Sequence, residues 1–184
     1  MNHGITLLTA TIMIMAAIMG VAQNYEHVPV WTGNLGGRIG SIKKQNDTII
    51  VASGDRIACL NQNGRLKWEH ATGNIVNSIM FYGDRIIASS TDHTTYMFSR
   101  EGRLLWKAET PGYVGYDNAL DARDGRILAG SVNGNAYMYD DSGNLLWEYY
   151  VGGYVMAVRI LEDSTVVVSD RQALILDLEG EVRT

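Results

Sequence analysis

The side chains of this sequence that could carry acid–base or metal chemistry are few and scattered. Three carboxylates, Asp117, Asp121 and Asp124, come close together, but the alternating Asp-x-Asp-x-Asp-Gly loop that binds calcium is absent. We interpret them as solvated turn residues. The chain has four histidines: His3, His27, His70 and His93. No two of them have the spacing of a zinc-binding pair, and no cysteine lies near them. The sequence therefore predicts no metal site.

The candidate nucleophiles lack the partners that catalysis needs. The chain has no Gly-x-Ser-x-Gly motif, and its serines recur at equivalent strand ends, where a hydroxyl can satisfy turn amides: Ser53, Ser90, Ser131 and Ser169. The single cysteine, Cys59, cannot form an internal disulfide, and its apolar neighbours predict a buried, inert thiol. We therefore expect no catalytic residue and no bound cofactor.

Tyrosines gather in two of the connections between the repeated units described below. They are Tyr113, Tyr116, Tyr149, Tyr150 and Tyr154, whereas the other connections carry Asn, Leu, Thr and Gly. Tyrosine is favoured at recognition surfaces because it offers contact area and a hydroxyl at low entropic cost. Aromatic packing on a pleated sheet is the alternative, and we favour it as the more ordinary use of tyrosine. If the chain has a binding surface, we expect it at these connections.

The elements that must position these residues are repeated along the chain. A glycine precedes a tryptophan by four residues in three places: Gly64 and Trp68, Gly102 and Trp106, Gly143 and Trp147. A fourth glycine, Gly180, begins a copy that lacks its tryptophan. The glycines lie 38, 41 and 37 residues apart, and a period near 40 is typical of stacked supersecondary units. We interpret all of these residues as structural, with the tryptophans packing between units.

Each repeat divides into four short segments separated by turns. The second segment is an aliphatic run too short for a helix, which predicts a strand buried on both faces. Its copies are 48–52, 85–89, 126–130 and 165–169. Turn residues such as Asn133-Gly134 follow it, and the glycine before each tryptophan strand occupies a position that favours positive φ. Four antiparallel strands per unit predict an all-β fold, a β-propeller of four-stranded blades.

The predicted propeller domain covers 23–184 and holds about four repeats. Trp31 lies 37 residues before Trp68, which predicts an orphan outermost strand at 28–32. The units that follow are about 37–70, 73–108, 112–149 and 153–184. We favour an incomplete ring over a small closed ring of four blades, because the sequence stops inside a predicted strand and four blades is the lower limit for propellers.

The first 22 residues contain no Asp, Glu, Lys or Arg and are largely apolar. Gly20-Val21-Ala22 offers small residues for a signal-peptide cleavage site, and we favour a cleaved signal over a retained membrane anchor. Either interpretation predicts that the chain is extracytoplasmic. If the segment is not cleaved, we expect it to be the only part of the chain that contacts a membrane. The net charge of −5 argues against a nucleic-acid partner, which requires a basic surface.

The Gly-x-Leu-x-Trp ending and the Ser-x-x-Gly turn before it resemble the quinoprotein-like, or PQQ-type, β-propeller repeat family. The best single match is Ser131 to Tyr137 followed by Gly143 to Trp147. The turn before the glycine is one residue shorter than in that family. Met97 and Met138 stand where the family has a small residue against which a tryptophan packs, so we expect the packing to be looser or differently arranged.

The resemblance also frames the functional alternatives. Dehydrogenases of the family have a full ring of blades, a calcium-binding set and a catalytic aspartate, which this chain does not match. The resemblance therefore implies a non-enzymatic, exported scaffold that binds a protein or an extracellular polymer. The alternatives are a fragment of a quinone-dependent dehydrogenase and an envelope-assembly scaffold, although no cysteine suited to lipidation follows the predicted signal.

Overall fold

The computed structural model describes residue 33 and residues 35–183, which fold as an all-β protein. Fifteen strands occupy these residues and pair in four antiparallel sheets, which we call blades 1 to 4 in chain order. Within the same residues, no helix has the length and apolar character needed to cross a membrane. The predicted leader at 1–22 and the predicted orphan strand at 28–32 lie outside the described residues.

The strands of each blade follow one another in sequence order across the sheet. Blade 1 contains β1 (Ile39–Gln45), β2 (Thr48–Ser53), β3 (Arg56–Asn61) and β4 (Leu66–Ala71). Blade 2 contains β5 (Val76–Tyr82), β6 (Arg85–Ser90), β7 (Thr94–Ser99) and β8 (Leu104–Glu109). Blade 3 contains β9 (Leu120–Arg123), β10 (Arg126–Gly130), β11 (Asn135–Asp140) and β12 (Leu145–Tyr150). Blade 4 contains β13 (Val155–Ile160), β14 (Ser164–Ser169) and β15 (Ala173–Asp177), and an isolated bridge joins Leu176 to Val182.

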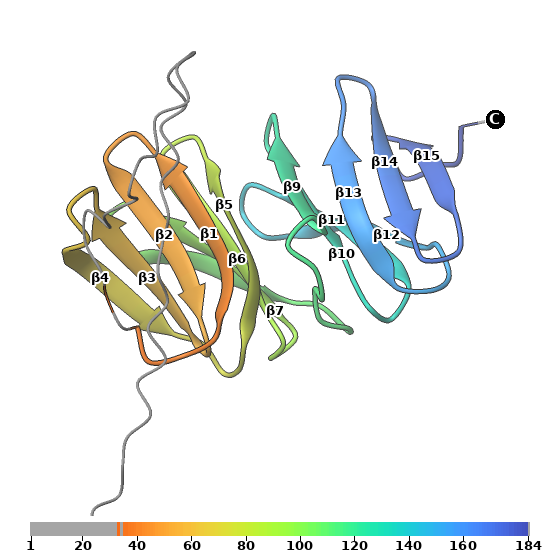
Figure 1. Cartoon of the computed structure of the whole chain (residues 1–184). Helices are drawn as coiled ribbons and strands as arrows, with labels where there is room; N and C mark the ends of the chain where they lie inside the picture. Colours follow the sequence, from red (N-terminus) through yellow and green to blue (C-terminus); the bar gives the residue numbers. More distant parts are fainter. Residues whose placement is uncertain (1–32, 34, 184) are drawn as a thin grey trace, which may run out of the picture.

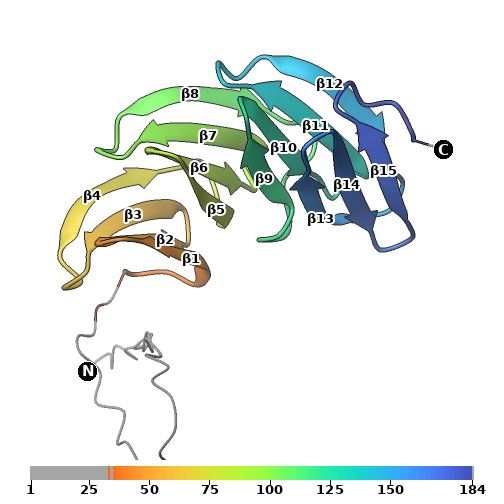
Figure 2. The same ribbon diagram turned by 90° about the horizontal axis from the view of Figure 1, so that it is seen from above.

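The four blades follow one another along an open arc (Figures 1 and 2). Figure 2 shows β1, β5, β9 and β13 along the concave side and β4, β8 and β12 along the convex side. No sheet of the described residues joins the two ends of the arc. The prediction of an incomplete β-propeller built from four-stranded blades is therefore confirmed.

The core lies between the blades. The aliphatic strands β2, β6 and β10 are buried along almost their whole length, as their sequence predicts. Blades 2 and 3 have a neighbouring blade on each face, so the apolar clusters there combine residues of two blades, such as Met97 of blade 2 with Ile127 of blade 3. In β14, by contrast, Val166 and Val168 are only half-buried. The outer face of β2 is buried with Leu35 and Ile39 packed against it, whereas the outer face of β14 has no such cover among the described residues.

The tryptophans fasten each blade to the next. In every case the indole N–H donates to a carbonyl in a turn of the following blade, at 2.8–2.9 Å: Trp68 to Arg100, Trp106 to Asp141 and Trp147 to Leu178. The ring lies on the glycine of that turn, since a Cβ added to Gly143 would approach Trp106 Cδ2 to 2.8 Å. All four turn glycines have the predicted positive φ: Gly64, Gly102, Gly143 and Gly180.

The residues opposite the tryptophans are accommodated without disturbing this contact. Cys59, Met97 and Met138 pair across the sheet with Trp68, Trp106 and Trp147, and all three are fully buried. A methionine side chain is flexible enough to fill the space that a smaller residue leaves. The tryptophan contacts are therefore alike at the two interfaces that carry a methionine and at the one that carries Cys59.

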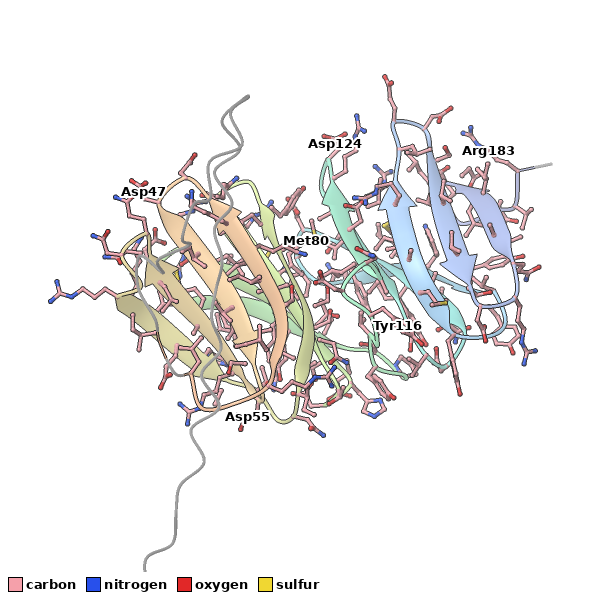
Figure 3. All side chains as sticks on the ribbon, in the orientation of Figure 1. Asp47, Asp55, Met80, Tyr116, Asp124 and Arg183 are labelled. Atoms are coloured by element: carbon pink, nitrogen blue, oxygen red, sulfur yellow. The ribbon has the colours of Figure 1, made fainter. Side chains whose placement is uncertain are left out.

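The arc has two edges with different connections. We call one the connection face, formed by the links between blades (72–75, 110–119 and 151–154) and by the turns between second and third strands. The turns between first and second strands, and between third and fourth strands, form the opposite turn face. In Figure 3, Asp55 marks the connection face, and Asp47 and Asp124 mark the turn face.

Candidate binding surface

The connection face is held together by the recurring serines. Ser90 Oγ donates to the carbonyl of Asn74 at 2.9 Å, and Ser131 Oγ donates to the carbonyl of Tyr113 at 3.2 Å. The same hydroxyls accept the amides of Asp92 and Asn133, both at 3.3 Å. Ser90 and Ser131 therefore each tie a tight turn to the preceding link. Ser169 also accepts two turn amides, so the prediction is confirmed for these three serines, whereas Ser53 donates to the carbonyl of Leu35 at 3.4 Å.

Asp92 organises the turn between β6 and β7. Its Oδ2 accepts the backbone amide of Gly73 at 2.7 Å and the phenolic hydroxyl of Tyr96 at 2.5 Å, while its Oδ1 accepts the amide of Thr94 at 3.0 Å. Burial, followed by the hydrogen bond to Asp92, raises the pKa of Tyr96 to about 12. The next residue, His93, has the left-handed backbone conformation, with a φ of 66°.

An open hollow of about 400 Å³ adjoins this turn, between blades 2 and 3. Its lining residues are Asp92, His93, Glu109, Thr110 and Pro111. The ring of Tyr113 meets the ring of His93 edge to face, with centroids 5.9 Å apart. The amide of Thr110 donates to the carbonyl of His93 at 2.7 Å, which fixes the floor of the hollow. The lining of the hollow therefore combines the carboxylates of Asp92 and Glu109 with the ring of His93.

Two of the predicted tyrosines are exposed to solvent where β12 leads into the link between blades 3 and 4. Tyr150 is 69% exposed and Tyr154 is 54% exposed. The Tyr150 ring lies against Gly134, where an added Cβ would come within 2.9 Å of its Cε2. The amide of Tyr154 donates to Asp170 Oδ1 at 2.7 Å, which ties the link to the following blade. The backbone that presents both rings is therefore fixed by hydrogen bonds.

The other predicted tyrosines are used for packing. Tyr116 packs against the core cluster between blades 2 and 3, and Tyr149 packs against the cluster between blades 3 and 4. Tyr113 is half-buried against His93. The packing interpretation therefore holds for Tyr116 and Tyr149. The proposed binding surface reduces to Tyr150, Tyr154 and the hollow beside Tyr113.

The acidic group at 117–124 does not lie where the sequence interpretation put it. Asp121 is on the inner strand β9, only 7% exposed, and its Oδ2 accepts the amide of Ile160 at 2.8 Å. Asp117 forms a 2.6 Å ion pair with Lys43 of blade 1. Asp124 alone is an exposed turn carboxylate, paired with Arg123. The interpretation as solvated turn residues is therefore wrong for Asp121, which joins blade 3 to blade 4.

Sequence reasoning missed a second hollow, of about 330 Å³, on the concave side of the arc. Its lining comes from the inner strands of all four blades and includes Lys43, Met80, Asp121 and Arg159. These four residues occupy one ladder position, because each pairs with the equivalent residue of a second strand. Figure 3 shows Met80 at the centre of this surface. Aligning the inner strands of the repeats could have found it.

The residues that the structure describes contain no group of three or more His, Cys, Asp or Glu side chains arranged to hold a metal ion. Cys59 is fully buried, and burial raises the pKa of its thiol. The connection face thus presents two exposed rings, Tyr150 and Tyr154, and a separate hollow lined by residues 92–93 and 109–111.

Comparison with known proteins supports the repeat interpretation. A family model described as outer membrane protein assembly factor BamB matches residues 26–182. The crystal structure of BamB from Moraxella catarrhalis is similar, with a TM-score of 0.71 and 18% identity over 86% of this chain and 51% of that chain. The computationally designed Ika4 protein is also similar, with a TM-score of 0.69 and 15% identity over 78% of this chain and 93% of that chain.

No curated protein matches the sequence. The chain spans about half of the BamB chain to which it is similar, and the solved structures share its fold at low sequence identity. The family model covers most of the chain, including all the blades that the structure describes. The chain therefore belongs to the PQQ-type β-propeller repeat family whose model is described as outer membrane protein assembly factor BamB.

Proposed function

We propose that this chain is an exported, non-enzymatic scaffold that binds an envelope protein through its connection face. The observation that carries the proposal is the pair of exposed rings, Tyr150 at 69% and Tyr154 at 54%, held on a backbone that Asp170 and Gly134 keep in place. Rigid aromatic side chains bind at low entropic cost, because little freedom is lost when the partner arrives.

The partner that fits this surface is a protein segment with planar and polar groups. The phenol rings offer apolar faces, and their hydroxyls offer hydrogen bonds. The nearby hollow adds the carboxylates of Asp92 and Glu109, which attract basic side chains. An assembly role in the cell envelope is supported by the description of the family, and export is supported by the uncharged apolar segment at 1–22.

A photo-crosslinking amino acid tests the surface. Placed at Tyr150 or Tyr154 in the full chain expressed in its own cells, it is expected to capture a defined envelope protein. The matched control is Asp84, which is exposed on the turn face and should capture little. Equal capture from both faces would contradict the proposal, as would capture of cytoplasmic proteins alone.

The double variant Tyr150→Ala/Tyr154→Ala should weaken binding of the captured protein at least about tenfold, since interface aromatics often contribute more than 1.4 kcal/mol each. Leu145→Ala/Leu146→Ala provides the control, because these residues are 52% and 50% exposed at the other end of the same strand. Unchanged affinity in the tyrosine variant would exclude these rings as the contact.

The dehydrogenase alternative makes an opposite prediction. If the chain were part of a quinone-dependent dehydrogenase, adding pyrroloquinoline quinone and calcium to it would produce cofactor absorbance and dye-linked alcohol oxidation. The scaffold proposal expects neither signal. Sustained turnover in this assay would overturn it, whatever the crosslinking experiment shows.

A further inference from the structure

The hollow on the concave side of the arc presents positive charge that the chain itself does not neutralise. Its two carboxylates are already occupied. Asp117 Oδ2 lies 2.6 Å from Lys43 Nζ. Asp121, only 7% exposed, accepts a backbone amide at 2.8 Å and Arg159 Nη1 at 3.3 Å. The Arg159 side chain is nevertheless 65% exposed, and Lys44 is exposed with no hydrogen bond or ion pair to any described residue. These two cations therefore remain available to an anion.

An apolar strip lies between the two available cations. Lys44 is on β1 and Arg159 is on β13, with β5 and β9 between them along the arc (Figure 2). Met80 and Phe81 of β5 line the hollow and are half-buried, so part of each side chain is open to it. The guanidinium of Arg100 lies over the Phe81 ring, 5.2 Å from its centroid, and adds positive charge beside the strip. A ligand that fits this lining has an apolar group next to an anionic one.

Two further features suit the backbone of a peptide. The exposed side-chain amide of Asn118 lines the same hollow and makes no hydrogen bond to any described residue, so its donor and its acceptor are both available. Each inner strand lies at the edge of its sheet, with no strand paired on its concave side. A peptide presents donors and acceptors along its backbone, whereas a simple aliphatic acid presents only its carboxylate. The lining therefore favours a peptide over a free small acid.

We propose that this hollow binds the C-terminal residue of an extended peptide whose last side chain is apolar. The terminal carboxylate contacts Lys44 and Arg159, where charge-assisted hydrogen bonds are stronger than neutral ones. The apolar side chain packs on Met80 and Phe81, and Asn118 holds the preceding peptide group. The volume of about 330 Å³ accepts the end of a chain but not a folded domain. Since the hollow is separate from the connection face, its test does not depend on the proposed function.

Calorimetric titration with two peptides tests the site. One is acetyl-Gly-Ser-Gly-Leu-Leu with a free C-terminal carboxylate, and the other is the same peptide with a C-terminal amide. With the full chain in a non-ionic detergent at low ionic strength, the free-acid peptide should bind at least about tenfold more tightly, and added salt should weaken it. Equal affinities, or no binding of either peptide, would overturn the proposal. Hexanoate that binds as tightly as the free-acid peptide would also overturn it, because the hollow would then take small acids rather than a chain end.

Lys44→Gln should weaken binding of the free-acid peptide about two- to fivefold and leave the amidated peptide unaffected. Lys107→Gln is the matched control, because it removes the same charge from an exposed position on the convex strand β8 and should not change either affinity. Arg159→Gln should act like Lys44→Gln. Since Arg159 also bonds Asp121, thermal unfolding of this variant checks that its fold is retained. Unchanged affinity in the Lys44 variant, or an equal loss in the Lys107 variant, would exclude the concave hollow as the binding site.

Discussion

Blades 2 and 4 are built on the same plan but differ in what covers them. Met97 in blade 2 and Ile175 in blade 4 hold the same ladder position, yet the first is fully buried and the second is half exposed. The strand β6 is buried throughout after its first residue, whereas β14 alternates between buried and half-buried residues. In a repeat protein, burial is thus decided by the neighbouring unit as much as by the residue itself.

The largest expected difference concerns thiol reactivity at this ladder position. Cys59 is fully buried, and burial raises its pKa, so it should react with a maleimide only after unfolding. A cysteine introduced by Ile175→Cys should react more than about 10³-fold faster in dilute solution, since a marginally stable domain opens that rarely. Labelling rates measured by mass spectrometry on the peptides that contain residues 59 and 175 would reveal the difference. Similar rates would show that blade 1 opens locally.

Truncating the side chain at this ladder position to alanine should lower the free energy of unfolding much more in blade 2 than in blade 4. Met97→Ala removes a buried side chain and should lower the free energy of unfolding by about 2–5 kcal/mol. Ile175→Ala should lower it by less than about 1 kcal/mol at concentrations where the chain is monomeric, because the side chain is already half in water. Urea unfolding measures both. Equal losses would contradict the view that blade 4 has an uncovered face.

A pair of glycines sharpens the comparison between a packed turn and an open one. Gly143 and Gly125 both have positive φ, at 84° and 81°, but an added Cβ meets Trp106 only at Gly143. Gly125→Ala should cost about 1–2 kcal/mol for the left-handed conformation alone. Gly143→Ala should cost about 1–3 kcal/mol more, because the tryptophan contact between blades must shift. Equal losses of unfolding free energy for the two variants, measured by chemical denaturation, would show that the contact with Trp106 does not contribute to the effect at Gly143.

The smallest effect concerns alkaline pH. Blade 2 has Tyr96 where the ladder of blade 4 has Leu174. Burial, and then the bond to Asp92, raise the pKa of Tyr96 to about 12 in the folded chain, so the folded state holds this proton more tightly than the unfolded state. The stabilisation is complete below pH ~10 and is lost as pH rises toward 12.

Thermal unfolding between pH 9 and pH 12 checks this sign. Burial also raises the pKa of Tyr139, which contributes in the same direction, so the informative quantity is the difference from Tyr96→Phe. That variant should lose less stability than the unmodified chain over the alkaline range. A parallel decline in both proteins would show that Tyr96 does not contribute.

The blades were predictable because their signals are local and recur. A glycine that requires positive φ, a tryptophan four residues later and a short aliphatic run together indicate one unit, and three copies leave little choice of fold. The burial of β14 was overestimated for a nonlocal reason. Its sequence, like those of β2 and β6, predicts burial on both faces, but no sequence pattern shows whether a following blade is present.

The candidate surface was only partly predictable. Tyr149 and Tyr150 are adjacent on β12 and point to opposite sides of the sheet, so strand alternation could have assigned one to packing and the other to solvent. The role of Asp121 was hidden because β9 is only four residues long and follows an irregular link. Its partner, the amide of Ile160, lies 39 residues away, and single-sequence patterns do not report such contacts.

The ion pair between Lys43 and Asp117 has a mechanical consequence. It joins blade 1 to the link that leads into blade 3 across the concave side, and the carbonyl of the same Asp117 accepts the hydroxyl of Ser78 in blade 2 at 3.0 Å. Both side chains are about one-third exposed, so dissolved salt weakens their attraction. The contribution of this contact to holding blade 1 near blade 3 therefore falls as ionic strength rises.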